Sequence, residues 1–204
     1  MPRRPARAAL PALVIGIALP IALAGCCLRP RTGCLAPTSN RARVEPGTGV
    51  AAVVGGTEAP AVPGAAVAWV AAEGVHVTGQ PDDAAFAAYS AAGYRTIVNF
   101  RPSSEGADRE RELVAANGMQ YFHLPVAGAG ITWGDADALA KILAGSGNGK
   151  VLLHCSSGNR VAGVWALYAS RHGGLSPEAA VAEGRRVGPL QPNVERRLGE
   201  MLAP

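Results

Sequence analysis

The chain has few aromatic residues, little charge and no metal-binding pattern. Aromatic residues make up 5% and charged residues 17% of the 204 positions, whereas glycine occurs 26 times and proline 16 times. This composition predicts a core built mainly from Ala, Val and Leu. The four cysteines form no CxxC pair and no Cys/His cluster with zinc spacing, so we expect no metal site, and nothing in the sequence suggests a cofactor.

An excess of positive charge is missing from the part of the chain that can form a domain. The formal net charge of +4 comes from the N-terminal third, where Arg3, Arg4 and Arg7 have no acidic residue near them. Residues 67–204 hold nearly equal numbers of basic and acidic side chains. A nucleic-acid-binding domain needs a basic footprint, so nucleic acid is not an expected partner.

The N-terminus has the layout of an export signal. The three arginines precede an apolar run over residues 8–24, as in a secretory signal peptide. The run ends in Leu23-Ala24-Gly25-Cys26, which resembles a bacterial lipobox. We therefore expect a lipoprotein signal peptide over residues 1–25 and a lipid on Cys26 that anchors the exported protein to a bacterial membrane, on the periplasmic side or the cell surface. A transmembrane anchor fits less well, because the run is short and contains two prolines. A disulfide between Cys26 and Cys34 is the other reading of that cysteine.

The rest of the chain divides into a linker and one domain. Residues 26–66 are rich in Pro, Gly, Ala and Arg without periodicity, which is typical of a flexible tether. Residues 67–204 are sufficient for a single domain. We expect strands at 67–70, 75–77, 96–100, 120–124 and 151–154, the first two as an edge hairpin, and helices at 83–92, 105–116, 134–144, after 160, and twice more near the C-terminus. This alternation predicts an α/β fold with a mostly parallel central sheet flanked by helices.

Two segments leave the predicted sheet at the same edge. Residues 99–102 and 154–160 both follow strands, and ligands of open α/β sheets bind outside the carboxyl ends of the strands. We expect these segments to share one cleft. Arg101 could contact a substrate there, or form a surface ion pair.

The second of these segments, residues 154–160, reads His-Cys-Ser-Ser-Gly-Asn-Arg and predicts an anion-binding loop. A buried strand delivers Cys155 into a tight turn that runs into a helix, so backbone N–H groups and the helix dipole converge on one point. The same field favours a thiolate, and the Arg160 guanidinium can hold two phosphate oxygens. A lone cysteine is more often inert, but these neighbours favour a reactive one. The substrate-binding candidates are His154, Ser156, Ser157, Gly158 and Asn159.

The loop resembles the signature of the protein tyrosine and dual-specificity phosphatases. The wider chain resembles their bacterial branch, the beta-lactamase hydrolase-like phosphatase domains, through residues 77–81, 93–102, 121–126 and 151–167. This resemblance implies hydrolysis of a phosphomonoester, carried by a protein or a small molecule, through a phosphocysteine on Cys155. It also implies that Arg160 and the loop amides bind the phosphoryl group and that His154 helps to set the thiolate.

Three departures from the phosphatase pattern leave alternatives open. Four residues separate Cys155 from Arg160 instead of five, and this spacing also resembles the active loop of single-domain rhodaneses, whose cysteine carries a persulfide. Val161 stands where the pattern often has Ser or Thr. Residues 125–130 hold no carboxylate to act as general acid. The nearest candidates are Asp135 and Asp137, which could equally cap a helix. A sulfurtransferase and a non-catalytic anion-binding module therefore remain alternatives.

Overall fold

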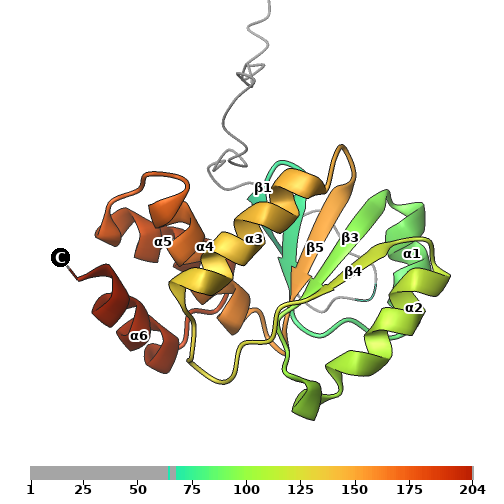
Figure 1. The fold of residues 1–204 in the computed structure, drawn as a ribbon, viewed down its shortest axis with the longest axis horizontal. Helices are drawn as coiled ribbons and strands as arrows, with labels where there is room; N and C mark the ends of the chain where they lie inside the picture. Colours follow the sequence, from blue (N-terminus) through green and yellow to red (C-terminus); the bar gives the residue numbers. More distant parts are fainter. Residues whose placement is uncertain (1–63, 65–67, 204) are drawn as a thin grey trace, which may run out of the picture. The chain divides into compact units, whose positions relative to one another are not determined.

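The computed structural model describes residue 64 and residues 68–203 (Figure 1). The predicted signal peptide, the lipidation site at Cys26 and almost all of the predicted tether lie outside the described residues. Within the described part, no helix combines the length and the apolar character needed to cross a membrane.

A five-stranded sheet forms the centre of the domain, in the order β1-β2-β5-β3-β4. The strands are β1 (Ala68–Ala72), β2 (Val75–Thr78), β3 (Tyr94–Asn99), β4 (Gln120–His123) and β5 (Lys150–His154). Only the β1–β2 pair is antiparallel, and the three other pairs are parallel. The fold class is therefore the predicted one, and β1 is the edge strand of the expected hairpin.

Helices cover both faces of the sheet (Figure 1). They are α1 (Ala85–Ala91), α2 (Glu110–Ala116), α3 (Trp133–Gly145), α4 (Asn159–Arg171), α5 (Pro177–Val187) and α6 (Pro192–Leu202). Because successive strand residues point to opposite faces, Leu152 joins the smaller core, under α1 and α2, whereas Val151 and Leu153 join the larger core with α3 to α6.

Helix α4 is the central element of the larger core. Its residues from Asn159 to Ala169 are all buried, and α4 packs against α3, α5 and α6. A helix enclosed in this way gives the loop at its N-terminus a rigid support.

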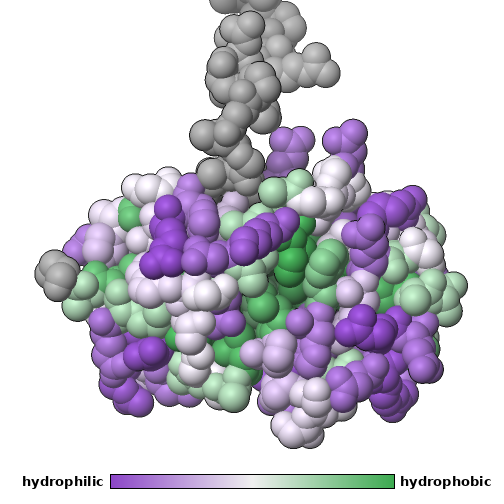
Figure 2. All heavy atoms as spheres, viewed as in Figure 1, coloured by the Kyte–Doolittle hydropathy of each residue, from purple (hydrophilic) through white to green (hydrophobic). Residues whose placement is uncertain are grey.

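Figure 2, drawn from the same side as Figure 1, shows hydrophobic surface gathered near the middle of this face and hydrophilic side chains around it.

The predicted helix over residues 105–116 is wrong in its first half. The chain instead forms two 3₁₀ turns, η1 (Ser103–Glu105) and η2 (Ala107–Arg109), before α2 begins at Glu110. Gly106 separates the turns with a left-handed φ of 81°, a conformation that glycine adopts without strain. Glu105 therefore lies on a turn of its own next to the carboxyl edge of the sheet.

Candidate active site

Cys155 follows the last residue of β5, and a short turn leads directly into α4. Gly158 is the N-cap of that helix with a φ of 88°. A Cβ on Gly158 would lie 3.0 Å from the Trp69 ring and 3.2 Å from Pro189, so the turn requires glycine for space as well as conformation. The Gly158 N–H donates to Cys155 Sγ over 3.1 Å. The predicted anion-binding loop therefore has its cysteine at the helix N-terminus, with a backbone amide directed at the sulfur.

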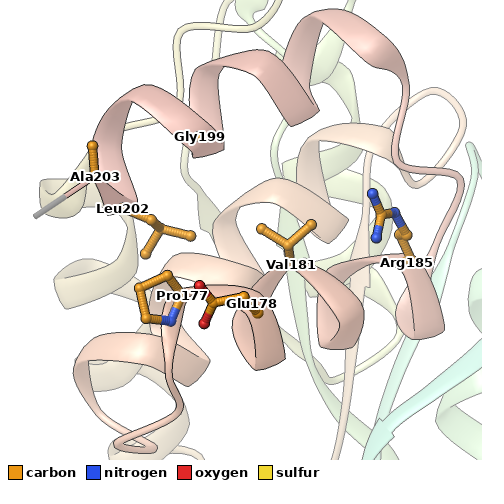
Figure 3. Close-up of a pocket in the computed structure, with 7 residues that line it drawn as sticks. All are labelled: Pro177, Glu178, Val181, Arg185, Gly199, Leu202 and Ala203. Carbon is orange, nitrogen blue, oxygen red and sulfur yellow. The ribbon is translucent and has the colours of Figure 1, made fainter.

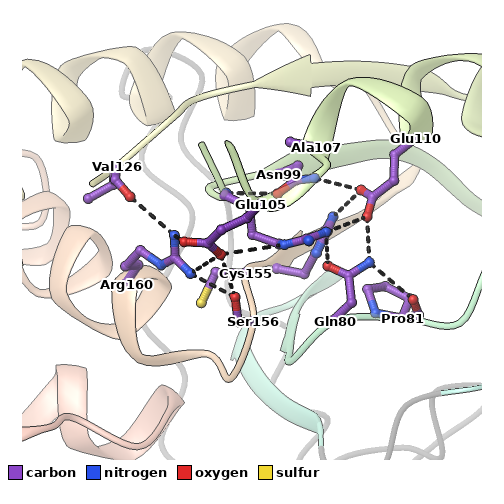
Figure 4. Close-up of polar contacts among 12 residues, drawn as sticks. Gln80, Pro81, Asn99, Glu105, Ala107, Glu110, Val126, Cys155, Ser156 and Arg160 are labelled. Carbon is purple, nitrogen blue, oxygen red and sulfur yellow. Dashed lines mark hydrogen bonds and ion pairs between the residues drawn. The ribbon is translucent and has the colours of Figure 1, made fainter. Parts of the chain in front are cut away.

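Arg160 extends its guanidinium over this turn (Figure 4). Nη1 donates to Glu105 Oε1 over 2.9 Å and to the Val126 carbonyl over 3.2 Å. Nη2 donates to Glu105 Oε2 over 2.7 Å and to Ser156 Oγ over 2.8 Å. Burial alone would lower the pKa of Arg160, but the contacts with Glu105 and Cys155 raise it. The guanidinium is thus a charged fork that already holds both oxygens of the Glu105 carboxylate.

Glu105 is a site residue that the sequence analysis did not single out. Its carboxylate accepts both arms of the Arg160 fork and a further hydrogen bond of 2.7 Å from Ser156 Oγ. The Arg160 hydrogen bonds lower the pKa of Glu105, and Ser156 and Arg101 add to this effect. The side chain is 37% exposed. A carboxylate therefore occupies the position where the predicted substrate would place its oxyanion.

A second carboxylate, Glu110, is buried behind the site. It accepts hydrogen bonds from Asn99 Nδ2 and Gln80 Nε2 and lies 3.1 Å from His154 Nε2. Burial opposes the ionisation of Glu110, but these contacts outweigh it and lower the pKa of Glu110. Arg101 is bound to the same group, 3.3 Å from Glu110. His154 therefore contacts Glu110, whereas Arg101 lies between Glu110 and Glu105, with its Nε 3.6 Å from Glu105 Oε2.

The other predicted site residues are distributed around the loop. Ser156 faces Arg160, as described, whereas Ser157 lines a largely apolar cleft of about 420 Å³ with Trp69. Asn159 Oδ1 accepts the Gln191 backbone N–H over 2.9 Å, which ties the start of α6 to the start of α4. Asn159 thus has a structural partner, and Ser156 is the loop side chain that reaches the anion position.

The two predicted acids both have partners at helix ends. Asp135 forms a capping box with Thr132 at the start of α3. Asp137 pairs with Arg171 and His172, at the far end of α4, roughly 16 Å along the helix axis from Arg160. The structure therefore does not bring Asp137 to the loop, and it shows Asp135 engaged as a helix cap.

A polar cavity of about 480 Å³ opens beside the loop, lined in part by Gln80, Arg101 and Glu105. Another groove of about 450 Å³ lies between α5 and α6 (Figure 3). None of its lining residues belongs to the loop, whereas Glu105 in the polar cavity binds Arg160 and Ser156 of the loop, so the polar cavity is the better candidate of these two for substrate entry. No group of three or more His, Cys, Asp or Glu side chains within residues 68–203 is arranged to hold a metal ion.

Comparison with known proteins identifies relatives of this region. The family described as beta-lactamase hydrolase-like protein, phosphatase-like domain, matches residues 67–171. Beta-lactamase hydrolase-like proteins from Xylella fastidiosa and Agrobacterium fabrum are 36% and 35% identical over 100 residues. These matches cover 47% of this chain but only 23% of each relative, so the chain spans about a quarter of their length.

Solved structures with the same fold include proteins described as phosphatases. A proposed phosphatase from Shewanella putrefaciens is 22% identical with a TM-score of 0.55, and the match covers 69% of this chain and 91% of that one. Kinase-associated phosphatase, with its catalytic-site cysteine replaced by serine, is 18% identical with a TM-score of 0.51, over 62% and 84% of the two chains. At these identities the likeness shows the fold alone.

Proposed function

The chain belongs to the beta-lactamase hydrolase-like phosphatase domain family, and we propose that it is a cysteine-dependent phosphatase that hydrolyses a phosphomonoester through a phosphocysteine on Cys155. Its substrate is a phosphorylated protein or a small phosphomonoester. The proposal concerns the matched domain alone, because the match covers only 23% of each curated relative.

The observation that carries the proposal is the two-pronged contact of Arg160 with the Glu105 carboxylate above the Cys155 turn. A carboxylate resembles two oxygens of a phosphoryl group in shape and charge, and guanidinium groups bind both in the same way. Ser156 Oγ completes the contact with the same carboxylate. The position is therefore suited to an oxyanion that needs two parallel donors and a hydroxyl.

The chemistry follows from this arrangement. A phosphoryl group takes the place of the Glu105 carboxylate on Arg160, with Cys155 next to it. The thiolate attacks phosphorus, a sulfur–phosphorus bond forms, and the bond to the leaving oxygen breaks. Water then attacks phosphorus and releases inorganic phosphate and the thiolate. Because Cys155 has no exposed surface, the site must open before a substrate can reach the sulfur, and we expect it to open at the Glu105–Arg160 contact.

Trapping the intermediate tests the proposal. We expect that the protein incubated with p-nitrophenyl phosphate and quenched with acid carries one phosphate on Cys155 by mass spectrometry. Cys155→Ser should lose turnover entirely, whereas Ser157→Ala, which changes a loop residue facing the apolar cleft, should retain it. Turnover that survives in Cys155→Ser would rule out the covalent mechanism.

A sulfurtransferase is the second candidate, and the loop itself favours it. Four residues between Cys155 and Arg160 match the rhodanese-like spacing, and Glu105 already compensates the charge of Arg160 in the resting site. Such a site could accept a sulfane sulfur, which carries less charge than a phosphate dianion. Thiocyanate formation from thiosulfate and cyanide, without phosphate on Cys155 in the trapping experiment, would favour this candidate over the phosphatase.

We also propose that the domain is exported and anchored to a membrane through a lipid on Cys26. The support is the lipobox-like sequence at residues 23–26 and the basic, apolar segment before it. Metabolic labelling with a clickable fatty acid should mark the wild-type protein and not Cys26→Ser. Labelling of Cys34→Ser at the wild-type level would show that the label is specific to Cys26.

A further inference from the structure

Proton transfer to the leaving group is the step for which the sequence offers no carboxylate in residues 125–130 and only Asp135 and Asp137 nearby. Asp135 accepts hydrogen bonds from the Thr132 backbone and hydroxyl. Asp137 is bound by Arg171 and His172 at the far end of α4. The carboxylate that does contact the anion-binding groups is Glu105.

The surroundings of Glu105 combine strong binding with freedom to move. Both carboxylate oxygens are held by Arg160, and Oε2 also accepts from Ser156 Oγ. The backbone of residues 103–106, in contrast, is a short exposed turn that ends at the left-handed Gly106. Such a segment has few buried contacts to hold it in place. Glu105 can therefore release Arg160 without disturbing the core.

We propose that Glu105 is the proton carrier of the reaction: it yields Arg160 to the incoming phosphoryl group, takes up a proton, and donates it to the leaving oxygen. This inference rests on the proposed phosphatase function. It assigns a catalytic role to the first residue of the helix predicted over residues 105–116, which the structure places on a 3₁₀ turn, rather than to either predicted acid.

Electrostatic interactions couple the binding of the phosphoryl group to the protonation of Glu105. In the resting site Glu105 faces Arg160 from α4 and Arg101 from the end of β3, whose Nε lies 3.6 Å away, and these cations hold the pKa of Glu105 below its usual range. A bound phosphate dianion would compensate Arg160 and add negative charge beside the carboxylate, and a neighbouring like charge favours the protonated form. The cavity also contains Asp82, Asp83 and Glu110, which act in the same direction, and Arg109, which opposes them.

The proton and electron pairs balance over both half-reactions. When the Cys155 thiolate attacks phosphorus, the leaving oxygen keeps the electron pair of its broken bond and takes the proton from the Glu105 carboxyl. The resulting carboxylate then removes a proton from the attacking water while the sulfur–phosphorus bond breaks and its electron pair returns to the thiolate. Glu105 ends the cycle protonated and reverts to a carboxylate when phosphate leaves and Arg160 becomes available again.

Leaving-group dependence tests the assignment. We expect Glu105→Gln to lower kcat/KM for phenyl phosphate, whose leaving group needs a proton, by about 10²- to 10⁴-fold. The loss should be far smaller for a substrate with an acidic leaving group, such as 2,4-dinitrophenyl phosphate. The matched control is Asp108→Asn, an exposed acid on the neighbouring turn that accepts from Ser103, which should leave both rates unchanged. An equal loss for both substrates in Glu105→Gln would overturn the proposal, while phosphate on Cys155 would still support the phosphatase.

A binding measurement separates the proton carrier from turnover. Calorimetric titration with sulfate at about pH 6, where free sulfate does not titrate and an unpaired glutamate is mostly ionised, should show uptake of close to one proton in wild type from its dependence on buffer ionisation enthalpy. Glu105→Gln should lose this uptake and bind sulfate about tenfold more tightly, because a competing anion has been removed. Sulfate binding without proton uptake in wild type would overturn the proposal, and so would unchanged uptake in Glu105→Gln.

Discussion

Each end of α4 carries an arginine that pairs with a carboxylate, but the surroundings of the two pairs differ. At the N-terminal end Arg160 binds Glu105, and the Arg160 side chain is only 10% exposed. At the C-terminal end Arg171 binds Asp137, and both side chains are about 40% exposed. An exposed pair is screened by water and contributes little. At the N-terminus the carboxylate is similarly exposed, but Arg160 is enclosed by Val126, Ser156 and the buried Cys155.

The helix dipole sharpens this difference. Cations stabilise the C-terminal end of a helix, so Arg171 and His172 stand where helix formation favours them. Arg160 is in the first turn of α4, where the partial positive charge of the dipole opposes a cation. Its position therefore depends on an anion, which is Glu105 in the resting site and, in the proposed reaction, the phosphoryl group. An arginine that the helix dipole disfavours and that is buried next to Cys155 is therefore the more informative sign of function.

Removing the arginine at each end should give the largest contrast. Arg160→Ala removes both donors to the oxyanion, and we expect kcat/KM for an aryl phosphate to fall by about 10²- to 10³-fold or more, as when a transition-state donor is lost. Arg171→Ala, eleven residues further along the same helix, should leave kcat/KM within a factor of two. Steady-state kinetics on the two variants checks this. Similar losses in both would mean that the two ends do not differ in function.

The glycines that flank α4 allow a second comparison. Gly158 and Gly174 both have left-handed φ values, 88° and 70°, so alanine should cost about 1 kcal/mol of backbone strain at either position. Only at Gly158 would the added Cβ also meet Trp69 and Pro189; at Gly174 no atom lies within 4 Å. Gly158→Ala should therefore lower the free energy of unfolding by roughly 2–4 kcal/mol in total, because overpacking adds to the strain. Urea denaturation of both variants measures this difference, and equal losses would show that the loop relaxes around a side chain.

The sequence predicted the parts of this comparison that depend on local pattern. Apolar strands, the Cys155 turn and the helix after it follow from periodicity and from the glycine before α4, and the structure has them within a few residues of the expected bounds. The adjacency of residues 99–102 and 154–160 was also foreseeable, because parallel strands end at one edge of the sheet; the Phe100 N–H donates to the His154 carbonyl there.

The carboxylates of the site were not predictable in the same way. Glu105 contacts Arg160 across 55 positions of sequence, and it is placed by a break at Gly106 that the charged run over residues 105–116 hides. Glu110 has the helical position expected of an exposed acid, yet it is buried under Asn99 and His154. The usable signal was the location of Glu105 six residues after the end of β3 at Asn99. Proximity in sequence to residues 125–130 led instead to the prediction of Asp135 and Asp137.

The smallest expected effect is at Asp137. Its hydrogen bond with His172 and its pairing with Arg171 lower its pKa, so any contribution to stability is present above its unfolded pKa and is lost as the pH falls through the folded one. Because the group is exposed, Asp137→Asn should leave both Tm at neutral pH and kcat/KM almost unchanged, and should slightly flatten the loss of Tm below about pH 4. Glu105→Gln should flatten that acid limb more, because its partner Arg160 is buried. Thermal melts of the two variants over the same pH series make the comparison. A tenfold fall in kcat/KM for Asp137→Asn would instead show that the far end of α4 takes part in the reaction.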